Sequence, residues 1–221
     1  MVTLCWAAKG GSGTTVVAAA LALSSPRPSL LVDLDGEIPA ALGLPEPERP
    51  GVAEWLASDT SADHLADLLI DIGSRTWLLP WRAGRPDDGP TATDRHSARW
   101  GTLGDWLHDW SNQWGCDVTV DVGTRLPPEP LGSRADRSLL VTRPCYLSLR
   151  RAVRSQVRPT GVILVDEPGR GLGPRDIEHA LGAPVEGVVS LDPNVSRAVD
   201  AGLLASRLPR VMTRALRQVS A

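Results

Sequence analysis

A glycine-rich segment, Lys9-Gly10-Gly11-Ser12-Gly13-Thr14-Thr15 (KGGSGTT), joins two segments that predict different secondary structure. Residues 2–8 (VTLCWAA) before it form a short apolar run typical of a buried strand, and residues 14–24 (TTVVAAALALS) after it predict a helix. A glycine loop between a strand and a helix N-terminus gathers unpaired backbone N–H groups at the positive end of the helix dipole. Such a loop favours phosphate binding, although glycine loops also end strands for purely structural reasons.

Short apolar strands alternate with helices along the rest of the chain. Residues 29–35 (SLLVDLD) predict a second buried strand, which closes a first strand–helix–strand unit. Further strands are predicted at 75–81, 117–122, 138–142, 161–166 and 185–191. Helices are predicted at 52–57, 62–70, 97–113, 146–157, 174–181, 195–204 and 210–219. The alternation predicts an α/β fold with a doubly wound, mostly parallel sheet flanked by helices, in a single domain spanning 1–221.

The composition excludes several classes of protein. With 42% hydrophobic and 22% charged residues, the chain is neither disordered nor collagen-like. Cys5, Cys116 and Cys145 are too few and too scattered for a zinc site or a disulfide framework. A net charge of -3 gives no support for nucleic-acid binding through overall charge. No apolar stretch approaches the roughly 20 residues of a membrane-spanning helix, and no signal peptide is recognisable, so we expect a cytoplasmic protein.

One compositional feature stands apart. Of the 23 basic residues, 22 are arginine, and Lys9 at the start of the glycine loop is the only lysine. Thr15 at the far end of the same loop is placed where a hydroxyl can bind Mg²⁺. The position of the loop, the single lysine and this threonine together favour phosphate binding over a purely structural turn.

These residues resemble a known family. KGGSGTT matches six of the seven positions of the deviant Walker A motif, K-G-G-x-G-K-[ST], of the ParA/MinD superfamily of P-loop ATPases. Asp33-Leu34-Asp35 resembles the D-x-D that closes the second strand in that family, and residues 117–123 (DVTVDVG) resemble its Walker B strand. Residues 140–152 and 187–204 are similar to later segments, so the resemblance spans nearly the whole chain.

The resemblance implies a P-loop NTPase fold, ATP and Mg²⁺ as ligands, and a role for each matching residue. The phosphates would bind to Lys9, Gly10, Gly11, Ser12, Gly13, Thr14 and Thr15. Thr15 and Asp121 would serve the metal, and Asp35 would position the attacking water. Lys9 would reach the partner's phosphates across a nucleotide-dependent homodimer, so that it supplies catalytic charge in trans.

The chain departs from the family at Thr14, which stands in place of the P-loop lysine. Losing one charge-assisted contact costs on the order of 1.5–3 kcal/mol, a roughly tenfold to hundredfold loss of nucleotide affinity. A second departure concerns the base, because Val165-Asp166-Glu167-Pro168 replaces the asparagine with which many relatives read adenine. ATP is favoured over GTP on family grounds alone, and Asp166 is able to accept hydrogen bonds from guanine.

The resemblance implies a switch that uses nucleotide state to position a partner such as DNA, a septum component or a secretion machine, with weak or impaired hydrolysis. The alternative is a non-hydrolysing scaffold. Members of the TadZ/CpaE branch, which localise pilus assembly machinery, include proteins with eroded Walker A motifs, and Thr14 fits that pattern. A module that regulates another enzyme is a third possibility.

Two surface features leave alternatives open. Trp106, Trp110 and Trp114 recur at helical spacing, which indicates either a helix face packed on the sheet or a docking surface for a partner protein. The segment 207–219 is amphipathic and carries Arg207, Arg210, Arg214 and Arg217. It predicts either a last helix that closes the sheet or a nonspecific contact with DNA or a membrane, which would place the protein peripherally at a membrane or nucleoid.

Overall fold

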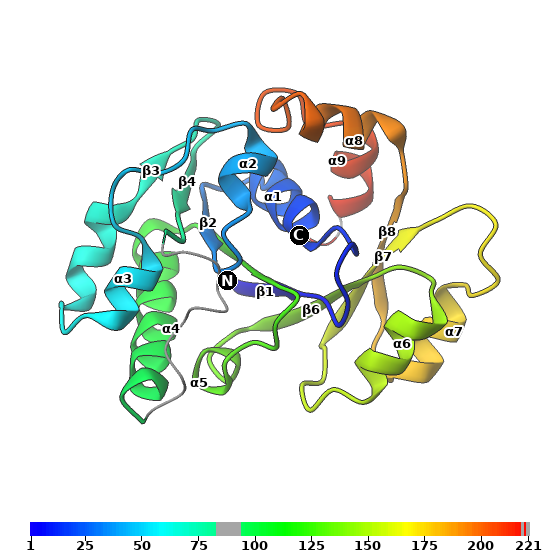
Figure 1. Ribbon diagram of the computed structural model, residues 1–221, viewed down its shortest axis with the longest axis horizontal. Helices are drawn as coiled ribbons and strands as arrows, with labels where there is room; N and C mark the ends of the chain where they lie inside the picture. The colour runs from blue at the N-terminus through cyan, green and yellow to red at the C-terminus, as the bar shows by residue number, and fades with distance from the viewer. Residues whose placement is uncertain (83–93, 218, 220–221) are drawn as a thin grey trace.

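The computed structural model describes residues 1–82, 94–217 and 219, and the described strands form an eight-stranded sheet (Figure 1). They are β1 (Val2–Trp6), β2 (Ser29–Asp33), β3 (Ile70–Asp71), β4 (Thr76–Leu79), β5 (Asp117–Gly123), β6 (Arg137–Thr142), β7 (Gly161–Asp166) and β8 (Val185–Ser190). Their order is β3-β4-β2-β5-β1-β6-β7-β8, and every pair except β3–β4 is parallel. The predicted α/β fold with a mostly parallel sheet is therefore confirmed.

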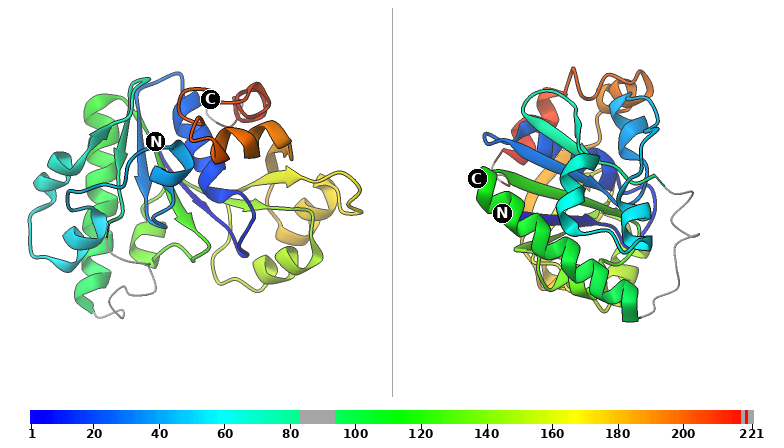
Figure 2. Two further views of the ribbon diagram at one scale, coloured as in Figure 1. Left: turned by 45° about the horizontal axis from the view of Figure 1, so that its top comes forward. Right: turned by 90° about the vertical axis from the view of Figure 1, so that its left-hand side faces the viewer.

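Helices cover both faces of the sheet (Figures 1 and 2). Helices α1 (Thr14–Ser24), α2 (Ile38–Leu42), α8 (Pro193–Asp200) and α9 (Arg210–Leu216) lie on one face. The other face is covered by α3 (Val52–Ala57), the 3-10 helix η1 (Ala62–Leu68), α4 (Asp94–Trp114), α5 (Glu129–Gly132), α6 (Tyr146–Val153) and α7 (Pro174–Leu181). A separate hydrophobic cluster fills each interface, as the continuous burial of β1, β2 and β5 requires.

Side-chain hydrogen bonds explain where two predicted elements end early. The predicted strand 29–35 ends at Asp33, because the Asp33 carboxylate accepts the N–H groups of Asp35 and Gly36 and turns the chain. The predicted helix 146–157 ends at Val153, and shortly beyond it the Ser155 hydroxyl accepts the Val157 N–H in a tight turn.

Other elements differ from the sequence prediction in kind. The predicted helix 62–70 is a 3-10 helix followed by the short antiparallel edge strand β3. Helices α2 and α5 were not expected, since each is a single turn that contains a proline near its start. Helix α8 begins at Pro193, two residues before the predicted start, because the Asp192 carboxylate caps it by accepting the Asn194 N–H at 2.8 Å. It ends at Asp200 and not at 204.

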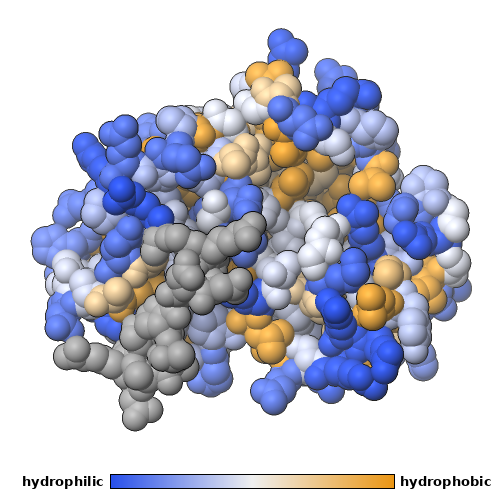
Figure 3. Space-filling model, viewed as in Figure 1, coloured by the Kyte–Doolittle hydropathy of each residue, from blue (hydrophilic) through white to orange (hydrophobic). Residues whose placement is uncertain are grey.

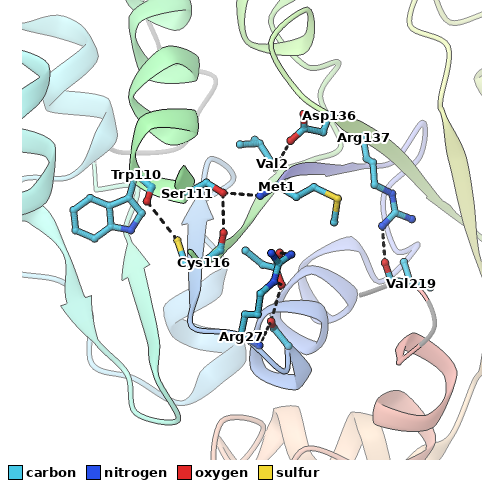
Figure 4. Close-up of polar contacts among 11 residues, drawn as sticks. Met1, Val2, Arg27, Trp110, Ser111, Cys116, Asp136, Arg137 and Val219 are labelled. Carbon is cyan, nitrogen blue, oxygen red and sulfur yellow. Dashed lines mark hydrogen bonds and ion pairs between the residues drawn. The ribbon is translucent and has the colours of Figure 1, made fainter. Parts of the chain in front are cut away.

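Polar contacts close the edge of the sheet at which the strands begin (Figure 4). Arg27, which precedes β2, forms an ion pair with Asp117 at the start of β5. The backbone N–H of Val2 donates to the Asp136 carboxylate at 2.7 Å, which ties β1 to the segment before β6. These contacts fix the starts of the central strands. The glycine loop lies at the opposite edge of the sheet, where the strands end.

A close approach between two glycines joins α2 to the segment after α8. Gly43 ends α2 with φ +72°, and a Cβ atom there would overlap the backbone of Gly202. We expect Gly43→Ala to lower the free energy of unfolding by about 3 kcal/mol, through both the left-handed backbone and the overlap. Gly182→Ala is the matched control, because Gly182 also ends a helix with φ +65° but has open space around it. Urea unfolding of both variants is the measurement, and equal losses would contradict the overlap.

Candidate functional site

The loop between β1 and α1 is shaped by two glycines with left-handed backbone. Gly11 has φ +75° and Gly13 has φ +88°, a region that side chains disfavour. Ser12 between them is buried, and its hydroxyl donates to the Lys9 carbonyl at 2.8 Å. The loop is therefore a fixed turn that leads directly into α1.

Open space lies in front of this turn. A Cβ at Gly11 would meet nothing within 4 Å, and one at Gly10 would meet only the Thr124 methyl at 3.9 Å. Gly13 is the N-cap of α1, and no side-chain cap hydrogen bond from the described residues reaches the start of the helix. Free N–H groups at a helix N-terminus beside open space are the arrangement that binds phosphate. The loop thus fits the phosphate chain that the resemblance implies.

Three aspartates come together next to the loop. Asp33 at the end of β2 lies opposite Asp121 of β5, and Asp121 lies opposite Cys5 of β1. Asp33 and Asp121 are both fully buried. The Asp35 carboxyl lies so close to Gly123 that a Cβ at Gly123 would overlap it. The structure therefore brings the D-x-D segment and the Walker B-like strand to one edge, beside the glycine loop.

The two buried carboxyls differ in their hydrogen bonds. Asp33 accepts three backbone N–H groups, including that of Ile38 at 3.2 Å, and so holds the turn after β2. Asp121 accepts the Gly123 N–H at 3.0 Å through Oδ1, while its buried Oδ2 has no hydrogen-bond partner among the described residues. An unpartnered carboxylate oxygen is costly to bury, and Mg²⁺ prefers such oxygen ligands. Asp121 therefore fits a metal, whereas Asp33 has a structural task.

Burial changes the acidity of both carboxyls. Loss of solvent is the largest cause, and it raises the pKa of Asp121 to about 7 and that of Asp33 to about 6. The charge of Asp33 raises the pKa of Asp121 further, while the adjacent Thr15 hydroxyl lowers it. Asp121 therefore keeps its proton to a higher pH than an exposed aspartate does.

The remaining predicted site residues lie in the loop and the first turn of α1. Thr15 is half-buried beside Asp121, as a shared metal ligand requires. Thr14 is 5% exposed. Lys9 is half-buried, its ammonium group donates to the Gly10 carbonyl at 3.4 Å, and it forms no ion pair with any residue that the structure describes. Its charge is therefore free to meet an external anion.

A cavity of about 220 Å³ continues from the loop. Gly13 joins it to the phosphate site, and its apolar walls include Val16 of α1, Val165 of β7 and Val189 of β8. The polar residues around it are Arg143, Ser190, Asp192, Ser196 and Asp200. Figure 3 shows hydrophobic side chains gathered on the surface where α1 faces α8. An apolar slot with few polar groups, next to a phosphate cradle, suits the base of a nucleotide.

The cavity contains residues that the sequence did not single out. Arg143 directly follows β6 and Asp192 directly precedes α8, so both stand at carboxyl ends of parallel strands, where ligands of such folds bind. That placement was the available signal. Asp166, considered as a reader of guanine, is not among the residues that line the cavity.

The tryptophan stripe packs on the core through two of its three members. Trp106 stacks on Trp110 at 5.2 Å, and Trp110 lies 5.5 Å from Trp114. The first two pack against the core, whereas Trp114 is 56% exposed. The stripe therefore packs on the sheet for most of its length, and docking through its exposed end remains a prediction.

Helix α9 closes the sheet with its apolar face. Met212 and Leu216 are buried, against α1 and β8, while Arg210 and Arg214 are exposed. Insertion of that apolar face into a bilayer would first require the helix to undock. Within the described residues, no helix combines the length and the apolar character needed to span a membrane. Contact with DNA or a membrane surface through the arginines remains a prediction.

Solved structures share this architecture over their whole length. The chain is 18% identical to a ParA family ATPase from Chlorobium tepidum, covering 99% of this chain and 98% of that one with a TM-score of 0.72. It is 19% identical to a chain of the MinC:MinD cell division complex of Aquifex aeolicus, over 100% and 96% of the two chains with a TM-score of 0.73. The septum site-determining protein MinD of Pyrococcus horikoshii, complexed with Mg-ADP, is 18% identical over 99% and 93%, with a TM-score of 0.72.

Neither a sequence-family profile nor a curated protein sequence matches the chain. The likeness is thus one of structure, at low sequence identity. The chain has the fold of the ParA/MinD family of P-loop ATPases, as the resemblance of its motifs implied.

The buried Asp121 carboxyl has a consequence for stability without ligand. Because its pKa in the folded protein exceeds its ordinary value, the folded state binds the proton more tightly, and Asp121 destabilises the fold increasingly as pH rises from about 4 to about 7. We expect Asp121→Asn to raise the free energy of unfolding by about 2–4 kcal/mol at pH 8 and much less at pH 5.

Urea unfolding in the presence of a chelator, at both pH values, measures this difference. Asp109→Asn is the matched control, because Asp109 is an exposed carboxylate on α4. A gain that is the same at both pH values, or a loss at pH 8, would show that the Asp121 charge is not the cause.

Proposed function

We propose that this chain is a single-domain ParA/MinD-like protein that binds ATP with Mg²⁺ and uses nucleotide state to position a partner. The observation that carries the proposal is the glycine cradle at the start of α1, set beside Asp121 with its unpartnered buried oxygen. A phosphate chain fits the cradle, and the cation that accompanies it fits Asp121. The ParA family ATPase and the Mg-ADP complex of MinD among the similar structures support the proposal.

Each site residue then has a task. Gly10 to Thr15 hold the phosphates, and Thr15 and Asp121 hold the metal ion. The positive charge of that ion would offset the negative charge of the phosphates. Asp35 lies against Gly123, next to the strand that carries Asp121, where a carboxylate can orient water. Lys9 serves the phosphates of a second copy in a nucleotide-dependent homodimer, because its ammonium group forms no ion pair with the described residues of its own chain.

The cellular task depends on a partner protein that acts as cargo or regulator. The similar structure of the MinC:MinD complex is an assembly of that kind. DNA or membrane contact in this chain is assigned to the exposed arginines of α9 and its flanks. The protein would then act in the cytoplasm and peripherally at a nucleoid or membrane.

A second function is favoured by one specific observation. Thr14 is almost fully buried and carries no charge where relatives have the P-loop lysine. Without this charge, we expect hydrolysis by the switch to be weak. In the alternative, the chain is a pseudo-ATPase that does not hydrolyse ATP. It keeps the fold and the dimer surface and acts as a scaffold that localises a pilus, secretion or septum machine. Turnover decides between the two.

Isothermal titration calorimetry with MgATP tests nucleotide binding. We expect the native protein to bind weakly, and Thr14→Lys to bind roughly tenfold to a hundredfold more tightly, because the lysine restores one charge-assisted contact. Thr102→Lys, at an exposed position of α4 on the opposite face of the sheet from α1, controls for the added charge. Absence of binding by the native protein at millimolar MgATP would overturn the proposal.

Phosphate release then separates the switch from the scaffold. If Lys9 acts across a dimer, Lys9→Ala abolishes turnover and lowers the ATP-dependent dimer fraction, measured by sedimentation velocity, while monomer affinity changes little. Tight binding without turnover in the native protein, with turnover restored by Thr14→Lys, would favour the scaffold. Unchanged turnover in Lys9→Ala would contradict catalysis in trans.

A further inference from the structure

Arg143 leaves the sheet at the level of the phosphate loop. Strands β1 and β6 are parallel neighbours, and Trp6 pairs with Leu140. Three residues beyond that pair, one segment reaches Lys9 and the other reaches Arg143. The two basic residues therefore enter the site from adjacent strand ends, although they are far apart in the sequence.

Arg143 lines the cavity, and its guanidinium forms no ion pair with the part of the chain that the structure describes. It lines the cavity together with Gly13 of the phosphate loop and Val165 at the end of β7. Its Nε atom is buried and has no hydrogen-bond partner among the residues in ranges 1–82 and 94–217. Buried polar groups are almost always paired, and an orphaned guanidinium N–H indicates a missing acceptor.

The acids of the same cavity do not supply that acceptor. Asp192 faces the cavity, but its Oδ1 accepts the backbone and side-chain N–H groups of Asn194, both at 2.8 Å. Asp200 also lines the cavity and forms no ion pair with Arg143. The acids that line the cavity therefore leave the Arg143 Nε–H group without an acceptor.

We infer that Arg143 binds the phosphate chain of the nucleotide and supplies, within the same chain, the positive charge that Thr14 lacks. The inference rests on the proposed function and names a further residue of that site. Arginine meets a phosphate through two parallel N–H groups, a geometry for which its planar fork is suited. The apolar walls of the cavity suit a base, whereas Arg143 shares the cavity with Gly13, where the phosphates would lie. Lys9 thus serves the partner's nucleotide and Arg143 its own.

Calorimetry with ATP, ADP, AMP and adenosine, each with Mg²⁺, tests this assignment on the full chain. We expect Arg143→Ala to weaken ATP and ADP binding by about tenfold to a hundredfold, the loss typical of one charge-assisted contact. AMP binding should weaken less, and adenosine binding should be unchanged. Arg143→Lys should recover part of the loss, because it keeps the charge without the planar fork.

Two further variants separate this role from a structural one. Arg150→Ala removes an exposed arginine of α6 that does not line the cavity, and it should bind all four ligands as the native protein does. Combined with Thr14→Lys, Arg143→Ala should cost less than it does alone, since the lysine then supplies the inner charge. The Tm of Arg143→Ala without ligand should not fall, because the Arg143 Nε atom has no hydrogen-bond partner among the described residues.

An equal loss for adenosine and ATP would overturn the inference and make Arg143 part of the base site. Unchanged ATP binding in Arg143→Ala would overturn it as well, while leaving the proposed function standing. A native protein that binds none of the four ligands would overturn the proposed function itself, so the two failures are distinguishable.

Discussion

The parallel register of β2, β5, β1 and β6 is the constraint on which the site depends. It sets Asp33 opposite Asp121, Cys5 opposite Asp121 and Trp6 opposite Leu140, so that four chain segments leave the sheet at one edge. The carboxyl ends of neighbouring parallel strands lie at the same edge of a sheet. The glycine loop, the buried acids and Arg143 are therefore neighbours for a reason of backbone geometry, before any side-chain chemistry acts.

The charged groups at that edge decide how a loop with Thr14 in place of a lysine can bind phosphate. Asp33 and Asp121 are buried at paired positions and burial raises the pKa of both, so a cation at this edge would offset the cost of burying their charges. The chain contains a single lysine, and its ammonium group is exposed to the surroundings of the loop and not committed to Asp121. If Arg143, which directly follows β6, binds the phosphates as we infer, it and a cation from solution balance their charge. The inner charge then comes from the end of a neighbouring strand and not from the phosphate loop.

Sequence reasoning reached the parts of the molecule that depend on local pattern. Apolar runs predict β1, β5 and β7, and glycines predict the loop before α1, because strands and turns each have their own sequence pattern. Single turns such as α2 are too short to show a period, and Asp33 ends β2 through hydrogen bonds that no pattern announces. Arg143 escaped notice because its importance arises from the β1–β6 pairing, which joins residues more than 130 positions apart. The pKa of Asp121 depends in the same way on the residue across the sheet.

The contact between Gly43 and Gly202 connects the two sides of the site. Asp33 holds the Ile38 N–H at the start of α2, α2 ends at Gly43, and Gly43 touches the backbone just beyond α8, whose residues wall the cavity. The contact therefore links the helix that starts beside the Asp33 carboxylate to the segment that follows the cavity-lining helix α8. A side chain at Gly43 would push these two segments apart, so its effect would extend from the fold to the wall of the cavity.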